Sequence, residues 1–197
     1  MGAASRVGTA LICGASQGAS QSAYRSIYKR SDALNGSHEN LYVKNMHTLS
    51  NPTVRNAVLL RLSRLQQKTE PLWGRMTAHE MLCHLCDSFK VPMGEKQASA
   101  ATGPLQRSIV KWIALYLPIH WPKGVPTRPE IEQGIGGTAP MDFDCDLREL
   151  RSIIERFTTR APAFSFAPHP FFGEMSFSEW TRWGYLHTDH HLRQFGV

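Results

Sequence analysis

The chain has 197 residues, a formal net charge of +6 and 42% hydrophobic residues, enough for one domain with a packed core. The charge is spread thinly, because residues 1–45 hold five Lys or Arg against two acidic residues and residues 46–197 hold 17 against 14. Such a mixed surface argues against binding to nucleic acid. No apolar run approaches the ~18–20 residues of a membrane-spanning helix, so we expect a soluble protein without a membrane partner.

The four cysteines indicate a reducing compartment. They are too few and too irregularly spaced for a disulfide framework in a chain of this length. Cys83 and Cys86 form a single CxxC motif with no second pair, inside a predicted helix. We expect both to be buried small apolar side chains, and the protein to be cytoplasmic.

Residues 1–45 differ in composition from the rest of the chain. They are rich in Ser, Ala, Gly and Asn and show no sustained apolar period, which is typical of disorder. We interpret them as a disordered leader or as a start assigned too far upstream, with Met46 as the alternative start. The folded domain is expected over residues 46–197.

Residues 46–197 carry the start and stop signals of helices. Apolar residues spaced by three and four, proline stops and two Ser/Thr-x-x-Glu capping boxes define the segments. The five expected helices run from Pro52 to about Gln66, from Thr77 to before Pro92, over Leu105–Leu117, from about Asp144 past Phe157, and from Ser176 to about Phe195. Residues 118–141 are rich in Pro and Gly and predict a long loop. Since no segment alternates with period two, we predict an all-α fold, an antiparallel four-helix bundle with one extra short helix.

Two histidines on the last expected helix have the spacing of metal ligands. His187 and His191 are four residues apart, so their side chains lie about 40° apart on one helical face. Two imidazoles one turn apart can reach a single ion. His190 is turned about 60–100° away from this pair, and we expect it beside the site or at the surface.

The second expected helix offers a third ligand. His84 lies at the edge of the apolar face, where it could point into the bundle, whereas His79 lies on the far side and is expected to be exposed. The zinc-protease motif HExxH fails here, because Cys83 occupies its second histidine position. We therefore predict a metal site on His84, His187 and His191, with a fourth position open to water or substrate. Zn²⁺ is the simplest metal, and Ni²⁺, Fe²⁺ or Mn²⁺ would also suit three imidazoles.

These residues resemble those of the DinB/YfiT-like superfamily of metalloenzymes, and most closely one of its branches, a domain of unknown function. The resemblance rests on Trp73–Ala78 with Met81–Leu85, and on His169–Gly173 with Trp180 and His190–Val197. It implies a DinB-like four-helix bundle over residues 46–197 and the same three histidine ligands. It also implies a small-molecule substrate, a low-molecular-weight thiol as co-substrate in some relatives, and a homodimer as one option.

The expected function is therefore a metalloenzyme that activates a thiol or water for transfer to, or hydrolysis of, a small substrate. Trp180, Trp183 and Gln194 are expected to line its substrate pocket. One alternative is a non-enzymatic, stress-related binding module with a structural or vestigial metal, for which Asp189 or Asp87 would close the fourth position. In the other alternative no metal binds and the histidines only pack.

Overall fold

The computed structural model describes residues 46–100, 103, 106–159 and 164–197, so the expected leader over residues 1–45 lies outside the described ranges. Within these ranges the fold is all-α, as predicted, and the only β-type pairing is an isolated bridge between His169 and Gly173. The elements are α1 (Pro52–Leu62), α2 (Ala78–Lys90), the π-helical turn η3 (Gln106–Val110), α3 (Lys111–Tyr116), the 3-10 turn η4 (Pro129–Ile131), α4 (Phe143–Thr158) and α5 (Phe177–Gln194).

Side-chain caps fix where the helices begin. Before α2, the Thr77 hydroxyl accepts from the backbone N–H of Glu80, whose carboxylate accepts from the N–H of Thr77. Ser176 and Glu179 form the same capping box before α5. Asp142 caps α4 by accepting from a backbone N–H of its first turn. Each cap satisfies N–H groups that have no partner inside the helix.

Two segments differ from the sequence-based expectation. The first helix ends at Leu62 rather than near Gln66, because the N–H groups of Arg64 and Leu65 bond to the carbonyls three residues back, of Arg61 and Leu62, in tight turns. The third segment is divided into η3 and the short α3, and η4 interrupts the long loop after it. No helix among the described residues is long and apolar enough to cross a membrane.

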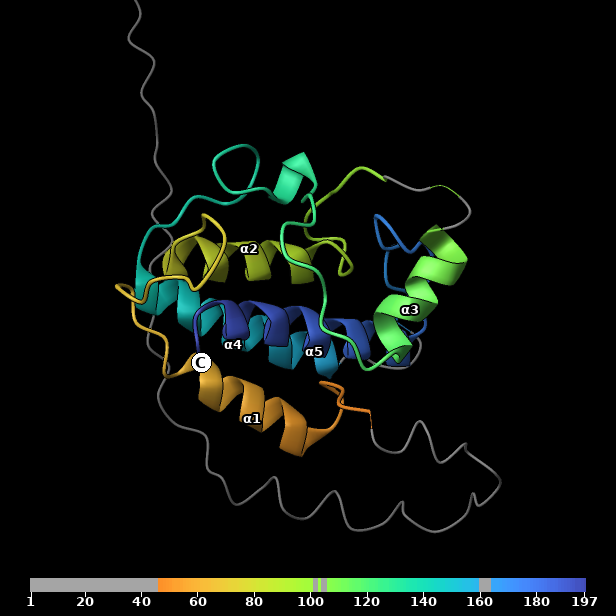
Figure 1. Cartoon of the computed structure of the whole chain (residues 1–197), viewed down its shortest axis with the longest axis horizontal. Coiled ribbons are helices and arrows are strands. Elements are labelled where there is room, and N and C mark those ends of the chain that lie inside the picture. Colours follow the sequence, from red (N-terminus) through yellow and green to blue (C-terminus); the bar gives the residue numbers. More distant parts are fainter. Residues whose placement is uncertain (1–45, 101–102, 104–105, 160–163) are drawn as a thin grey trace, which may run out of the picture. The chain divides into compact units, whose positions relative to one another are not determined.

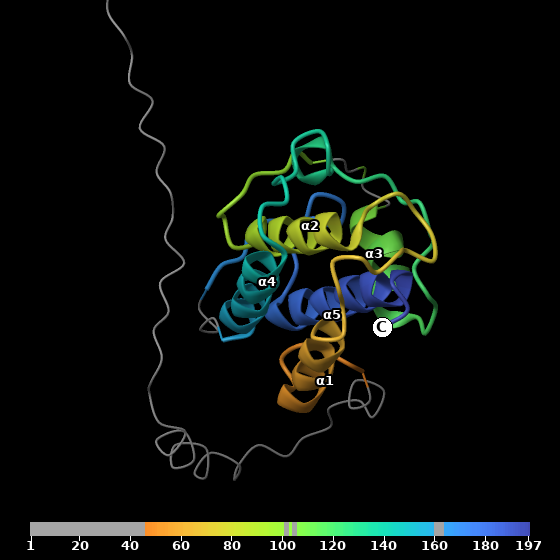
Figure 2. The same cartoon turned by 90° about the vertical axis from the view of Figure 1, so that its left-hand side faces the viewer.

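Helix α2 packs against both α4 and α5, while α1 and α3 each pack against α5 (Figures 1 and 2). Their facing side chains form one apolar core, because each helix is apolar on the side that meets its neighbours. The largest fully buried side chains are Leu49, Leu62, Met81, Leu82, Leu85, Phe89, Leu115, Leu150, Ile153, Ile154, Phe157 and Trp180. The core therefore fixes α2 and α5, the two helices that carry the predicted ligands.

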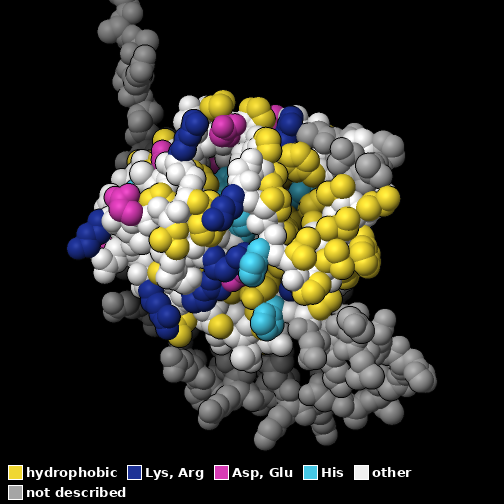
Figure 3. Space-filling view, viewed as in Figure 1, with side chains coloured by type: hydrophobic (Ala, Val, Ile, Leu, Met, Phe, Trp, Pro, Cys, Tyr) yellow, Lys and Arg dark blue, Asp and Glu magenta, His cyan; other side chains and the backbone are white. Residues whose placement is uncertain are grey.

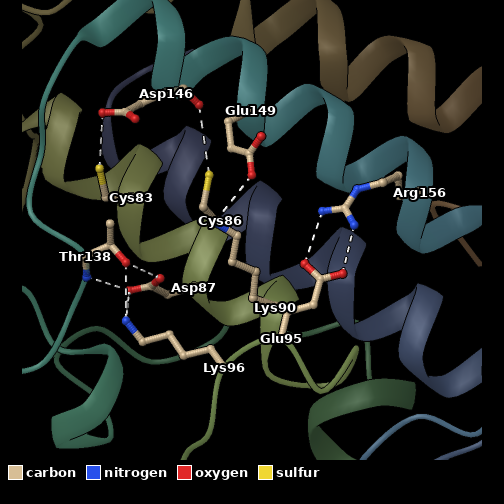
Figure 4. Close-up of polar contacts among 10 residues, drawn as sticks. All are labelled: Cys83, Cys86, Asp87, Lys90, Glu95, Lys96, Thr138, Asp146, Glu149 and Arg156. Carbon is tan, nitrogen blue, oxygen red and sulfur yellow. Dashed lines mark hydrogen bonds and ion pairs between the residues drawn. The ribbon is translucent and has the colours of Figure 1, made fainter. Parts of the chain in front are cut away.

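The buried carboxylate of Asp87 fastens the end of the long loop after α3 to α2 (Figure 4). Asp87 is fully buried and accepts from Lys96 Nζ at 2.8 Å. The backbone N–H and the hydroxyl of Thr138 each donate to the same carboxylate at 2.7 Å. Since a buried charge is costly without such partners, these contacts hold the end of the loop against α2.

Candidate metal centre

His84 from α2 and His187 and His191 from α5 meet with their Nε2 atoms. The Nε2 atom of His187 lies 3.3 Å from that of His84 and 3.2 Å from that of His191. The three side chains could together hold one metal ion. His84 and His191 are buried and His187 is nearly so. The structure thus brings together the three residues that the sequence analysis selected.

The outer nitrogens of two of these rings are held by acceptors. His84 Nδ1 lies 3.2 Å from the backbone carbonyl oxygen of Ile131, which can only accept, so this nitrogen carries the proton. His191 Nδ1 lies 2.8 Å from Gln194 Oε1. The amide nitrogen of Gln194 donates to the carbonyl of Trp73, which identifies Oε1 as the acceptor and His191 Nδ1 as the donor.

A glycine lets Gln194 reach this position. Gly74 has a φ of +86°, and a Cβ atom there would come within 2.6 Å of Gln194 Nε2. The backbone N–H of Leu72 also donates to the carbonyl oxygen of Gln194 at 2.7 Å. The segment before α2 therefore runs close against the end of α5. Only glycine adopts a positive φ at this position and also leaves room for the Gln194 side chain.

Because a neutral imidazole has one N–H and one lone pair, His84 and His191 both present a lone pair at Nε2. Each of these lone pairs faces His187 Nε2, and one proton on that atom cannot form two good hydrogen bonds. Two nitrogens bound at ~2.0–2.1 Å to one tetrahedral ion would lie about 3.3 Å apart. The measured separations of 3.2 and 3.3 Å fit this arrangement.

Burial disfavours the charged form of all three imidazoles. It is the largest cause that lowers the pKa of His84, and it lowers the pKa of His187 and His191 well below the usual range. The neighbouring histidines lower the pKa of His187 and His191 further, since a second positive ring would repel the first. Neutral rings are the form that binds a metal.

The other residues singled out in the sequence lie around this cluster. Trp180, Trp183 and Gln194 are buried and line one cavity together with the three histidines. His190 is half-buried against the ring of Trp121, outside the cluster, as its rotation on the helix predicts. Arg193 is on the outer side of α5, where it pairs with an acidic residue one turn before it.

The two carboxylates considered as a fourth ligand are engaged elsewhere. Asp189 accepts from Arg61 at 2.6 Å and from Arg193 at 2.9 Å. Asp87 is held by Lys96 and Thr138, as described above. No carboxylate or thiol belongs to the histidine cluster among the described residues. The side of the cluster that lines the cavity is therefore free of a protein ligand within that part of the chain.

Sequence reasoning missed three residues that shape the site. Trp121 donates its indole N–H to the carbonyl of Ala114, and its ring lies 6.0 Å from that of His187, measured between centroids. Ile131 supplies the carbonyl that orients His84. His169 also lines the cavity, and its Nδ1 accepts from the backbone N–H groups of Phe171 and Phe172. Only the sequence block His169–Gly173 gave any signal for these roles.

The expectation that His79 is exposed is wrong. His79 is buried, with 8% of its surface accessible, and its Nε2 lies 2.6 Å from Asp146 Oδ2 on α4. The Cys83 thiol donates to the same oxygen at 3.5 Å (Figure 4). These residues form a second group of metal-type donors, but here they act as a hydrogen-bonded brace between α2 and α4. Burial and Asp146 raise the pKa of Cys83 to about 12, which keeps the thiol protonated.

Cys83 and Cys86 are both buried, in agreement with the prediction of small apolar side chains.

Comparison with known proteins gives a match to a protein family. The family model described as a protein of unknown function, DUF1569, covers residues 45–196. No curated protein and no solved structure shows significant similarity to the chain.

Proposed function

Because the chain belongs to the DUF1569 family, whose description assigns no function, we propose a function from the site itself. The protein binds one divalent metal ion on His84, His187 and His191 and uses it to activate a thiol or a water toward a small substrate. Zn²⁺ is the first candidate, and Ni²⁺, Fe²⁺ or Mn²⁺ are alternatives that three imidazoles also suit.

One observation carries this proposal. Three Nε2 atoms converge in a buried place, and the partners of His84 and His191 leave both of these nitrogens with lone pairs. Burying such atoms without a partner is costly. A cation between them would satisfy all three at once, whereas a single proton on His187 would leave one unsatisfied.

A bound divalent ion would supply Lewis-acid chemistry, lowering the pKa of a water or thiol that it contacts. The chain supplies the rest. Ile131 and Gln194 fix the orientation of two ligand rings through their outer nitrogens, which is how neighbouring groups tune metal ligands in general. The rings of Trp121 and Trp183 flank the third imidazole, that of His187.

Three finer features of the proposal rest on the resemblance to the DinB-like superfamily: the antiparallel four-helix bundle of α1, α2, α4 and α5, a low-molecular-weight thiol as co-substrate, and a homodimer. A cytoplasmic location is proposed from the cysteine pattern. The His-x-x-x-His spacing on α5 together with a histidine on α2 supports the relationship.

Metal content measured by mass spectrometry on untagged protein tests the proposal. We expect about one equivalent in the wild type and none in His187→Ala and His191→Ala. The control is His120→Ala, since His120 is exposed and outside the cluster. A wild type that holds no metal, and gains none from added Zn²⁺ or Ni²⁺, would contradict the proposal. So would equal metal content in all four proteins.

A further inference from the structure

A cavity of about 600 Å³ lies against the three histidines. Its walls come from several separate segments: the loop before α2, α2 itself, α3, the loop after α3, the turn at His169 and helix α5. This volume is that of a pocket for a small molecule, which usually measures ~300–1,000 Å³. The cavity is therefore large enough for a substrate that reaches the metal centre.

The walls of the cavity are mainly apolar and aromatic. Aromatic rings line it from Trp73, Trp121, Phe171, Phe172 and Trp183, and aliphatic side chains from α3 and the following loop complete it. Apolar side chains also gather on the surface over α3 (Figure 3). Such walls favour a molecule whose body is apolar, because water in contact with them finds no hydrogen-bond partners on the apolar side chains and is readily displaced.

The charged residues of the cavity are all of one sign. Arg75 and Arg128 line it, and no Asp, Glu or Lys does so among the described residues. A cationic molecule would consequently lose its hydration and find no carboxylate to pair with.

Several buried polar atoms next to this space have no hydrogen-bond partner within the described residues. They include the hydroxyl of Ser88 and the indole N–H of Trp180, whose side chains are 3% and 1% exposed. The Nε atom of Arg128 is in the same situation. An indole N–H and a guanidinium N–H can only donate, so they call for acceptor atoms on a ligand.

We propose that this cavity is the substrate pocket and that its substrate is a mainly apolar small molecule that carries no positive charge and has hydrogen-bond acceptor oxygens. A ketone or ester on an aromatic or branched aliphatic body has this chemistry. The inference rests on the proposed function in one respect only, that the molecule bound here is the one on which the metal centre acts.

Binding of the uncharged fluorophore N-phenyl-1-naphthylamine tests the proposal in protein treated with EDTA and in protein loaded with Zn²⁺. We expect a saturable rise in fluorescence in both samples. The ketone 4-phenyl-2-butanone should displace the probe, and the cation 4-phenylbutylammonium should require about tenfold more or fail to displace it, because no carboxylate lines the cavity.

Two rim positions allow matched variants that leave the core untouched. Ile119 and Val125 line the cavity and are 50% and 55% exposed, so Ile119→Asp and Val125→Asp should fold and weaken probe binding about tenfold. Ile109 is 56% exposed and does not line the cavity. Ile109→Asp is therefore the control and should bind the probe as the wild type does.

The outcomes separate this inference from the proposed function. Absence of probe binding, or equal binding by Ile119→Asp, Val125→Asp and Ile109→Asp, would overturn the pocket, and so would better displacement by the cation than by the ketone. Metal content is measured on the same samples. Probe binding by protein that takes up no Zn²⁺ when Zn²⁺ is added would refute the metal centre and support the pocket, while Zn²⁺ uptake without probe binding would refute the pocket alone.

Discussion

At the scale of single residues, Gln194 should decide how well the proposed site holds a metal. Its amide links the ring of His191 to the backbone of Trp73 and thereby fixes which nitrogen of His191 is free. Such partners of ligating histidines contribute substantially to metal affinity. Gln194 would therefore be a positioning residue, which contacts the proposed ligand His191 and not the ion.

We predict that Gln194→Leu weakens Zn²⁺ binding by about 10–100-fold, because His191 loses its acceptor. Gln194→Glu keeps an acceptor for His191 Nδ1 but loses the donor to Trp73, so its affinity should stay close to that of the wild type. A competition titration with a chromophoric chelator measures both. If the two variants lost affinity equally, the link to Trp73 rather than the orientation of His191 would be what matters.

His169 gives the protein a pH dependence of stability. Burial lowers its pKa from 6.5 to about 3. The unfolded chain binds a proton at this residue below pH 6.5, and the folded protein does not until about pH 3. Stability is therefore fully present above pH 6.5 and falls as the pH decreases between these values.

We expect the wild type to lose about 1.4 kcal/mol at pH 5.5 relative to pH 7.5 through His169 alone. His169→Asn keeps an acceptor for the backbone N–H groups of Phe171 and Phe172 and cannot titrate. Urea unfolding at both pH values should show that the free energy of unfolding of His169→Asn falls by about 1.4 kcal/mol less than that of the wild type. If the free energy of unfolding fell equally in the two proteins, protonation of His169 would not destabilise the folded state.

At the scale of elements, Asp146 links α4 to α2 by hydrogen bonds. Its carboxylate accepts from His79 and Cys83 on α2 and from the backbone N–H of Met141. Removing the charge leaves buried donors with a weaker partner. Asp144 lies in the same first turn of α4, is exposed and is not part of this group.

We predict that Asp146→Asn lowers the free energy of unfolding by about 1–3 kcal/mol. Asp144→Asn should cost about 0.3–1 kcal/mol, since it loses only the favourable position of an acidic residue at a helix N-terminus. Chemical denaturation of the two variants makes the comparison. Equal losses would show that the cross-helix contact adds nothing to the effect of the helix dipole.

Elements and site differ in how far the sequence predicts them. Capping boxes are local, so Thr77 and Ser176 mark the starts of α2 and α5 correctly. The pairing of His187 with His191 follows from helical periodicity, which is local as well. His79 was misjudged because its partner Asp146 is 67 positions away on another helix. The roles of Trp121 and Ile131 depend on how an irregular loop crosses the site, which no periodic pattern encodes.

At the scale of the whole molecule, a metal ion on this site would join α2 to α5. His84 belongs to one helix and His187 and His191 to the other, and the loop carrying Ile131 rests on the same cluster. A ligand that binds only the folded chain stabilises all of it. Folding and metal binding should therefore be linked in this protein.

We predict that Zn²⁺ at a free concentration of about 100 times its Kd raises the free energy of unfolding of EDTA-treated protein by ~2.7 kcal/mol. For a domain of this size the midpoint of thermal unfolding should rise by roughly 5–11 °C. His187→Ala should show no rise, because two imidazoles remain, while His120→Ala should show the full rise. Differential scanning calorimetry with and without Zn²⁺ measures both. An equal rise in His187→Ala would mean that the ion binds elsewhere on the folded chain and that the histidine cluster is a packing arrangement.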